Sequence, residues 1–247
     1  MNVSLYQAAA AMNAHERWQE LITENLGSSS VPGARKNYIS FAAVEAGLPA
    51  ALNGGGYGRF RLPAAIPSTS FIQGQLRPTG NKFDFALEGT GFFEVQLPDG
   101  THAYTRDGEF RLNGQGQLTN KQGHLVLTNG GPVQFDPNNA LPITVGPDGT
   151  ITQGTETRGK LHIVEFKDPG KLTSAGPGCF TNQQPDMLAE DAKQTSVRQA
   201  YLEGANTTPT IEMSELINAM RMFEANQRVL SMQDDRLGKV ITELGHT

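Results

Sequence analysis

The chain has 247 residues and a formal net charge of -5, which is enough length for one large domain or two small ones. The acidic balance argues against a nucleic-acid-binding protein, because such proteins usually present a basic face. A single cysteine excludes an internal disulfide framework and a cysteine-based metal site, and the 28 glycines favour many tight turns and therefore many short strands.

Residues 3–26 are predicted to form an amphipathic helix. Apolar side chains recur there at near-helical spacing, and Gly27, the serines at 28–30 and the pair Pro32-Gly33 end the pattern. We expect this helix to take part in assembly through a set of apolar side chains, namely Leu5, Met12, Trp18, Ile22 and Leu26.

The first residues lack the features of a cleaved secretory signal. Residues 1–11 contain no Lys or Arg, and the four alanines at 8–11 make a weak apolar core for such a signal. The sequence has no run of about 18 apolar residues, so no membrane span is expected. The chain is therefore predicted to be cytosolic or to leave the cell by a route that needs no cleaved signal.

Residues 31–70 are predicted to form an extended or mobile connector. The Ala-rich stretch 42–51 has helical propensity, but Pro49 interrupts it, and residues 53–58 are nearly all glycine. Pro63 and Pro67 continue the irregular pattern.

The pattern changes to short strands between Phe71 and about Ala205. Apolar residues alternate in the run 91–118, and further strands are expected at 143–145, 151–152 and 161–166. Gly accepts a positive φ and Asp tolerates it, so three sequences have the composition of tight turns: Pro98-Asp99-Gly100, Arg106-Asp107-Gly108 and Pro147-Asp148-Gly149. This middle region is therefore predicted to be an antiparallel β domain.

The last segment, Met213 to Leu244, carries the most regular apolar pattern of the chain. Apolar residues recur at spacings of three, four or seven, with Gln227 and Asp234 in the gaps, which is typical of a helix that packs one narrow face against another helix. Such a helix would be roughly 48 Å long, and the two polar residues would fix its register. The predicted seam consists of Met213, Leu216, Met220, Phe223, Leu230, Leu237, Ile241 and Leu244.

Together these segments predict an α+β fold. Long N- and C-terminal helices would pack as a coiled-coil-like pair, with a central, mainly antiparallel β domain between them in the sequence. The predicted divisions are an N-terminal assembly helix at 1–30, a connector at 31–70, the β domain at 71–205 and a C-terminal assembly helix at 206–247.

The sequence contains no recognisable catalytic, cofactor or metal site. The run 154–160 resembles a phosphate-binding loop, but Leu161 replaces the required Ser or Thr and a strand is expected to follow instead of a helix. Asp99, Asp107 and Asp148 could be imagined as calcium ligands, but each is explained by its turn. The chain is therefore predicted not to be an enzyme and to need no cofactor or metal.

The histidines and the cysteine also favour structural roles. The five histidines show no metal-ligand or catalytic spacing. His102, His124 and His162 lie in predicted strands, where solvated or hydrogen-bonded surface positions are expected. Cys179 is expected to be an inert packed residue.

Two blocks of sequence resemble a known family. The run GFFEVQLPDGTHAYTRDGEF, which begins at Gly91, is similar to the shared signature of the bacterial flagellar basal-body rod and hook proteins. The runs YLEGAN at 201–206 and RMFEANQ at 221–227 resemble that family's C-terminal motif. The N-terminal part departs from the family pattern, since Ala34 stands where the family usually has an aromatic residue in a Thr-x-Gly-Phe-Lys turn.

The resemblance implies a structural subunit of the flagellar rod. Members of the family resemble helical-tube subunits whose terminal helices form an inner layer and whose β domain packs outside. They are exported by the flagellar type III apparatus without a cleaved signal, and their partners are other rod and hook subunits. The C-terminal runs favour the proximal rod type, whereas the 91–110 run suits the distal type equally well.

From the residues alone, the main alternative is a globular binding module. It would be a carbohydrate- or peptide-binding β domain with a helical stalk.

Overall fold

The computed structural model describes residues 3–46, 60–136, 141–176, 178–184 and 187–244. The chain divides into two compact units. Unit 1 consists of Met1–Leu26, Asn37–Thr69 and Pro209–Thr247, and unit 2 consists of Gly27–Lys36 and Ser70–Thr208. Each unit is therefore built from segments that are far apart in the sequence.

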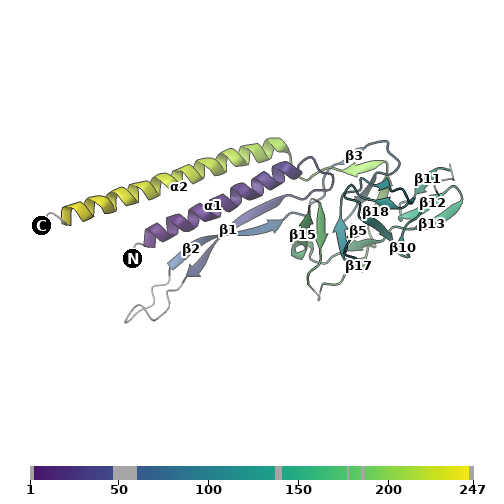
Figure 1. Cartoon of the computed structure of the whole chain (residues 1–247), viewed down its shortest axis with the longest axis horizontal. Coiled ribbons are helices and arrows are strands. Elements are labelled where there is room, and N and C mark those ends of the chain that lie inside the picture. Colours follow the sequence, from purple (N-terminus) through teal and green to yellow (C-terminus); the bar gives the residue numbers. More distant parts are fainter. Residues whose placement is uncertain (1–2, 47–59, 137–140, 177, 185–186, 245–247) are drawn as a thin grey trace. The chain divides into compact units, whose positions relative to one another are not determined.

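Unit 1 contains two helices and a two-stranded ribbon. Helices α1 and α2 run side by side in opposite directions (Figure 1). Asn25, near the end of α1, contacts Glu212 at the start of α2, and the earlier Gln19 donates to the carbonyl of the later Ala219. The elements are α1 (Val3–Ser28), β1 (Asn37–Ala46), β2 (Phe60–Thr69) and α2 (Pro209–Leu244).

Helix α2 begins before the predicted seam, at Pro209. Proline suits the first position of a helix, because its fixed φ is already helical and the N–H that it lacks would have no partner there. Glu212 in the first turn is favoured by the helix dipole. In the described part of either helix, no stretch is long and apolar enough to cross a membrane.

The prediction that the two terminal helices pack as a coiled-coil-like pair is wrong. Unit 1 is not a pair of helices alone, because α1 also packs against the ribbon. The Phe41 ring lies 5.9 Å from the Trp18 ring and 5.6 Å from the His15 ring. Trp18, one of the predicted assembly residues, is in contact with this strand. The structure therefore combines two terminal helices, a two-stranded ribbon and a separate multi-strand antiparallel domain.

The ribbon lies where the sequence predicts an irregular connector. Strands β1 and β2 pair in an unbroken antiparallel register from Asn37↔Thr69 to Ala46↔Phe60. Pro63 and Pro67 do not prevent this, because both strands of a two-stranded ribbon are edge strands and tolerate proline. Pro49 and the glycine-rich run 53–58 lie outside the described residues.

Unit 2 is a β domain in which all strand pairs of the described residues are antiparallel. The path through its main sheet is β15 (Thr173–Gly176), β16 (Cys179–Thr181), β6 (His102–Thr105), β5 (Phe92–Gln96), β9 (Leu125–Thr128), β8 (Leu118–Thr119) and β7 (Arg111–Leu112). Three short strands join it at the side: β10 (Gly131–Pro132) on β9, β14 (Ile163–Glu165) on β5, and β17 (Glu190–Asp191) on β14.

Smaller sheets complete unit 2. A three-stranded sheet consists of β11 (Ile143–Val145), β12 (Thr150–Gln153) and β13 (Glu156–Lys160). Two further pairs are β4 (Phe85–Glu88) with β18 (Ser196–Gln199), and β3 (Leu76–Pro78) with β19 (Tyr201–Glu203). A short 3-10 helix spans Pro169–Lys171.

Two apolar clusters form the core of unit 2. The larger gathers side chains from the main sheet, the three-stranded sheet, the β4–β18 pair and the segments between them, including Phe85, Phe93, Val95, Phe110, Leu118 and Ile151. The smaller contains Phe92, Tyr104, Val164, Phe166, Leu172 and Phe180, with Phe71 and Met187 packed against it. Aromatic rings meet edge to face in both, as between Phe93 and Phe110 at 5.2 Å and between Tyr104 and Phe166 at 4.7 Å.

Two of the three predicted turns are confirmed. Gly100 and Gly149 have φ of 84° and 83°, and the preceding aspartates accept hydrogen bonds from Thr101 and Thr150. The third prediction, at 106–108, is wrong. Arg106 and Asp107 are buried, and a Cβ atom on Gly108 would lie 1.7 Å from the Phe85 carbonyl oxygen. This segment passes through the interior of unit 2, where only glycine fits against β4.

Candidate assembly site

Helix α2 has one covered face within unit 1. Glu212 and Ala219 are fully buried, and Leu216, Phe223 and Leu230 are half-buried. These positions follow one another at spacings of four, three, four and seven, so they lie on one side of the helix. Three of the predicted seam residues therefore belong to the covered face.

The other predicted assembly residues have different surroundings. Met213 and Met220 are 53% and 50% exposed, and Gln227 and Asp234 are exposed as well. On α1, Ile22 is buried, whereas Met12, Trp18 and Leu26 are half-buried. The side chains of the remaining four lie outside the described residues: Leu5, Leu237, Ile241 and Leu244.

Exposed apolar side chains flank the covered face of α2 on both sides. At 100° per residue, one flank carries Met213, Ile217 and Met220, and the other carries Ile211, Met222 and Val229. All six are between 41% and 55% exposed. Grouped apolar side chains on a surface are typical of interaction sites, whereas isolated ones need no explanation.

A buried asparagine joins the three elements of unit 1. The Asn25 Nδ2 of α1 donates to the Asn37 carbonyl of β1 at 2.6 Å and to Glu212 Oε2 of α2 at 3.2 Å. Its Oδ1 accepts the Asn37 N–H at 2.8 Å. Both Asn25 and Glu212 are buried, so these hydrogen bonds fix the start of α2 and the start of β1 against the end of α1.

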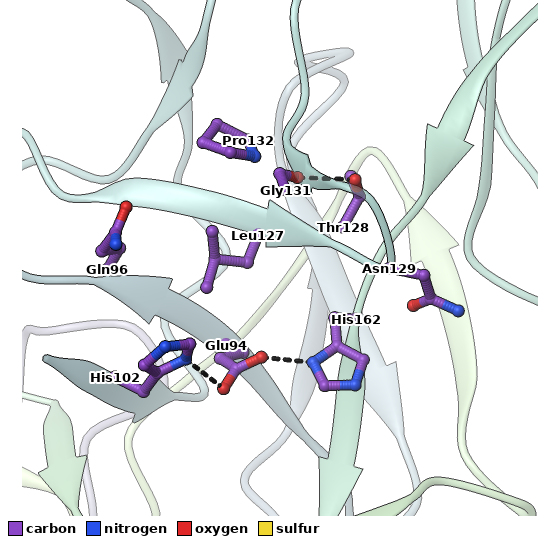
Figure 2. Close-up of a pocket in the computed structure, with 9 residues that line it drawn as sticks. All are labelled: Glu94, Gln96, His102, Leu127, Thr128, Asn129, Gly131, Pro132 and His162. Atoms are coloured by element: carbon purple, nitrogen blue, oxygen red, sulfur yellow. Dashed lines mark hydrogen bonds and ion pairs between the residues drawn. The ribbon is translucent and has the colours of Figure 1, made fainter. Parts of the chain in front are cut away.

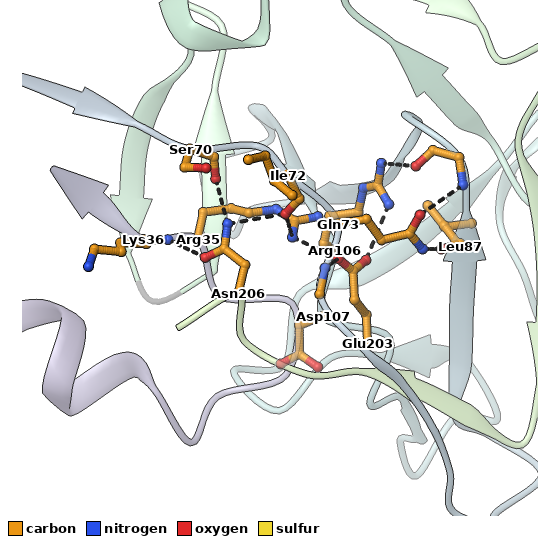
Figure 3. Close-up of polar contacts among 12 residues, drawn as sticks. Arg35, Lys36, Ser70, Ile72, Gln73, Leu87, Arg106, Asp107, Glu203 and Asn206 are labelled. Carbon is orange, nitrogen blue, oxygen red and sulfur yellow. Dashed lines mark hydrogen bonds and ion pairs between the residues drawn. The ribbon is translucent and has the colours of Figure 1, made fainter. Parts of the chain in front are cut away.

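A second buried polar cluster, the Glu203 junction, lies in unit 2 (Figure 3). Glu203 Oε1 lies 2.7 Å from Arg35 Nη1, and Oε2 lies 3.2 Å from Arg106 Nη1. Oε1 also accepts the Gly74 N–H at 2.8 Å. All three charged side chains are at most 2% exposed. One carboxylate therefore holds a segment from each of three distant parts of the sequence.

The backbone around this junction is closely packed. Gly33, with φ of 69°, donates its N–H to the Glu203 carbonyl at 2.7 Å, and a Cβ there would lie 2.3 Å from the Arg106 carbonyl carbon. A Cβ on Gly74 would lie 2.0 Å from the Gly204 oxygen. The glycine of the diverged N-terminal turn is thus required by a positive φ and by a backbone contact.

Asn206 fixes the neighbouring segments of unit 2. Its Oδ1 accepts the Lys36 N–H at 2.6 Å, and its Nδ2 donates to the carbonyls of Ser70 and Ile72 at 2.8 and 3.1 Å (Figure 3). The Ser70 N–H donates to the Lys36 carbonyl at 2.9 Å. One side chain therefore holds the residues that precede β1 and those that follow β2.

Burial perturbs the charged groups of the segment 106–107. Burial lowers the pKa of Arg106 to about 10, although Glu203 favours its charged form, so this residue stays charged at neutral pH. Burial also raises the pKa of Asp107 to about 6, against the hydrogen bond from the Glu109 N–H and the attraction of Lys121.

The structure offers no evident chemical centre in the residues it describes. Their His, Cys, Asp and Glu side chains form no group of three or more that could hold a metal ion. Cys179 is buried, and burial raises the pKa of its thiol, which makes it a poor nucleophile.

Sequence reasoning missed the roles of Glu203, Arg35 and Arg106. Glu203 and Asn206 belong to the run YLEGAN, which carried only the family resemblance. The available signal was the position of Glu203, a charged residue between the apolar Leu202 and Gly204. The backbone of Gly204 packs closely against Gly74, so a charged side chain beside it lies in a tightly packed region. Its two arginine partners lie 168 and 97 positions away, and no sequence spacing indicates them.

The Glu203 junction can be tested by neutralising its carboxylate. Glu203→Gln should lower the free energy of unfolding by roughly 3–5 kcal/mol, because it leaves two buried guanidinium groups without a counter-charge. Urea unfolding followed by circular dichroism measures this. Glu88→Gln is the matched control, since Glu88 and Arg198 form an exposed pair at 2.8 Å and such pairs contribute about 0–1 kcal/mol. Equal losses in the two variants would contradict the assigned role.

The raised pKa of Asp107 predicts a pH-dependent stability. The folded state keeps this proton up to about pH 6, whereas the unfolded chain releases it near pH 4. The free energy of unfolding should therefore fall as the pH rises from 4 to 7, by up to about 3 kcal/mol. Asp107→Asn should remove this fall in urea titrations at each pH, and Asp99→Asn, in an exposed turn, should retain it. A fall that persists in Asp107→Asn would assign it to another group.

Comparison with known proteins identifies the family. A family model described as the flagellar hook protein FlgE/F/G D1 domain matches residues 86–153. A second, described as the flagellar basal body rod FlgEFG protein C-terminal region, matches residues 198–243. These ranges contain much of the β domain and most of α2.

Similar proteins extend over nearly the whole chain. Flagellar basal-body rod protein FlgF of Mesorhizobium japonicum is 31% identical over 99% of each chain, and FlgF of Caulobacter vibrioides is 27% identical over 99% of each. Flagellar basal-body rod protein FlgG of Borreliella burgdorferi is 30% identical over 95% of this chain and 96% of its own. The resemblance that the sequence indicates is thus confirmed, and the chain belongs to the family of flagellar basal-body rod proteins.

Proposed function

We propose that this chain is a non-enzymatic structural subunit that polymerises through its terminal helices into the axial tube of the flagellar rod, which transmits torque. Membership of the rod family supports the structural role. The observation that carries the assembly mode is the pair of apolar flanks on α2, at Met213, Ile217 and Met220 and at Ile211, Met222 and Val229. Burying such surface contributes about 25 cal/mol per Å², so many modest contacts can hold a tube.

The partners and location follow from the same proposal. Neighbouring copies and other rod and hook subunits would cover the flanks of α2, and the predicted seam residues Leu237, Ile241 and Leu244 would contribute to the same contacts. The chain would reach the periplasmic rod through the flagellar type III export apparatus. Family membership supports this route.

We further propose that the subunit is of the proximal rod type. Two FlgF relatives match this chain over 99% of both lengths, and the runs at 201–206 and 221–227 favour the same type. The distal type is the alternative, because a FlgG relative is 30% identical over 95% of this chain.

The assembly surface can be tested with a charge on one flank. Met220→Asp should abolish rod incorporation, because a carboxylate would be buried in a contact between subunits. It should leave the thermal unfolding of the monomer nearly unchanged, since Met220 is half exposed there. Swimming in soft agar and electron microscopy of isolated basal bodies measure assembly. The matched control is Ser214→Asp, which places the same charge at an exposed polar position of α2 on the side opposite the covered face, between the two flanks. Normal rods in Met220→Asp would refute the proposed surface.

The subunit type can be tested by complementation. The gene is placed in strains that lack either the proximal or the distal rod subunit, and basal bodies are examined by electron microscopy. The proximal assignment predicts that only the first strain regains a complete rod, because neighbours along the rod must fit each end of the subunit. Rescue of the second strain alone would assign the distal type instead.

A further inference from the structure

A buried carboxylate lies between two imidazoles at the edge of a pocket in unit 2. The pocket has a volume of about 360 Å³ and is lined by strands β5, β6, β9 and β10, by Asn129 and by His162, which directly precedes β14. Figure 2 shows both imidazoles turned toward Glu94. His102 Nδ1 lies 2.7 Å from Glu94 Oε1, and His162 Nδ1 binds Oε2. The Glu94 side chain is 9% exposed.

His162 differs from His102 in the surroundings of its second nitrogen. Its Nε2 lies 3.2 Å from Asp191 Oδ1, so each ring nitrogen faces a carboxylate oxygen. An ionised carboxylate can only accept hydrogen bonds, and a neutral imidazole has only one N–H to donate. A neutral His162 between two ionised carboxylates can therefore form only one of the two hydrogen bonds. Both can form only when one additional proton is bound to His162, Glu94 or Asp191.

We propose that His162 is a proton-dependent latch that fastens strand β17 to the sheet. The protonated imidazole donates to Glu94 and Asp191 at once. When the pH rises and the additional proton is lost, the imidazole can no longer donate to both carboxylates, and one of the two hydrogen bonds breaks. The Asp191 side chain is 81% exposed and can turn into water, whereas Glu94 is buried and is also bound by His102. Asp191 is therefore the group that is released.

The latch acts on a weakly held part of unit 2. Strand β17 pairs with β14 through only two residue pairs, Val164↔Asp191 and Glu165↔Glu190, and the Ala192 N–H then donates to the Ile163 carbonyl at 2.9 Å. A strand of two residues at the side of a sheet opens readily, so one side-chain contact measurably changes how often it opens.

The charged and titratable groups around His162 come from four elements. Glu94 on β5 and Asp191 on β17 contact it directly. On β6, His102 binds Glu94, and the charge of Glu94 adds to the burial that raises the pKa of Tyr104. Glu165 on β14 is occupied by Thr195, whose hydroxyl donates to it at 2.7 Å. His162 therefore contacts two carboxylates, and His102 shares one of them.

Hydrogen exchange of the full chain tests the latch. The probe is the Ala192 amide, measured by NMR from pH 7 to 8.5, a range above that in which Asp107 titrates. After correction for the intrinsic pH dependence of exchange, its protection should fall at least about threefold as the pH rises. The Val197 amide, which donates to the Pro147 carbonyl in the same unit, should keep its protection.

Three variants separate the latch from other causes. His162→Asn removes the titrating group, and Asp191→Asn removes the need for a second N–H, so both should make the Ala192 protection independent of pH. His124→Asn removes a histidine whose Nδ1 faces the Asn120 amide instead of a carboxylate, and it should keep the threefold fall. An unchanged Ala192 protection in the wild type would overturn the proposal. A fall that persists in both His162→Asn and Asp191→Asn would also overturn it.

Discussion

The carboxylate of Glu203 is where three separate stretches of unit 2 meet. Arg35 comes from the segment that follows α1, Arg106 from the end of β6, and the Gly74 N–H from the segment that follows β2. The backbone carbonyl of the same residue accepts the Gly33 N–H. Water has no access to the buried carboxylate to replace a lost partner. The positions of the residues that lead into β1 and of those that lead into α2 therefore depend on one side chain in β19.

This junction is better suited to specifying an arrangement than to adding stability. Two guanidinium groups and one carboxylate leave a buried excess of one positive charge, and Arg35 Nε and Nη2 and Arg106 Nε have no hydrogen-bond partner in the described part of the chain. The free energy that is lost when such charges leave water is about as large as the free energy gained from their mutual attraction. Removing one partner, in contrast, leaves an uncompensated buried charge and is strongly destabilising. We interpret the junction as a device that penalises wrong arrangements of these segments.

The sequence predicts those parts of the fold whose signals are local. The apolar spacing predicts both helices, and Asp99-Gly100 and Asp148-Gly149 predict their turns, because each signal lies within a few residues. The ribbon was missed because β1 and β2 are separated by 13 residues and rich in Ala and Pro, so neither strand has a clear alternation. The buried contacts of Asn25 and Glu203 were missed for another reason. Their partners lie as far as 187 positions away, and only the fold brings them together.

Helix α2 is longer and more apolar than its place in unit 1 requires. It has 36 residues and α1 has 26, so about 15 Å of α2 has no counterpart in α1. Its covered face, which includes Glu212 and Ala219, already meets the needs of a monomer, yet Met213, Ile217 and Met220 lie on one side of that face and Ile211, Met222 and Val229 on the other. A single partner would cover one flank and leave the other in water. Two different contacts on opposite sides of one subunit do not close into a dimer but continue from copy to copy. The pattern of α2 therefore supports the proposal of a subunit with neighbours on both sides, as a tube requires.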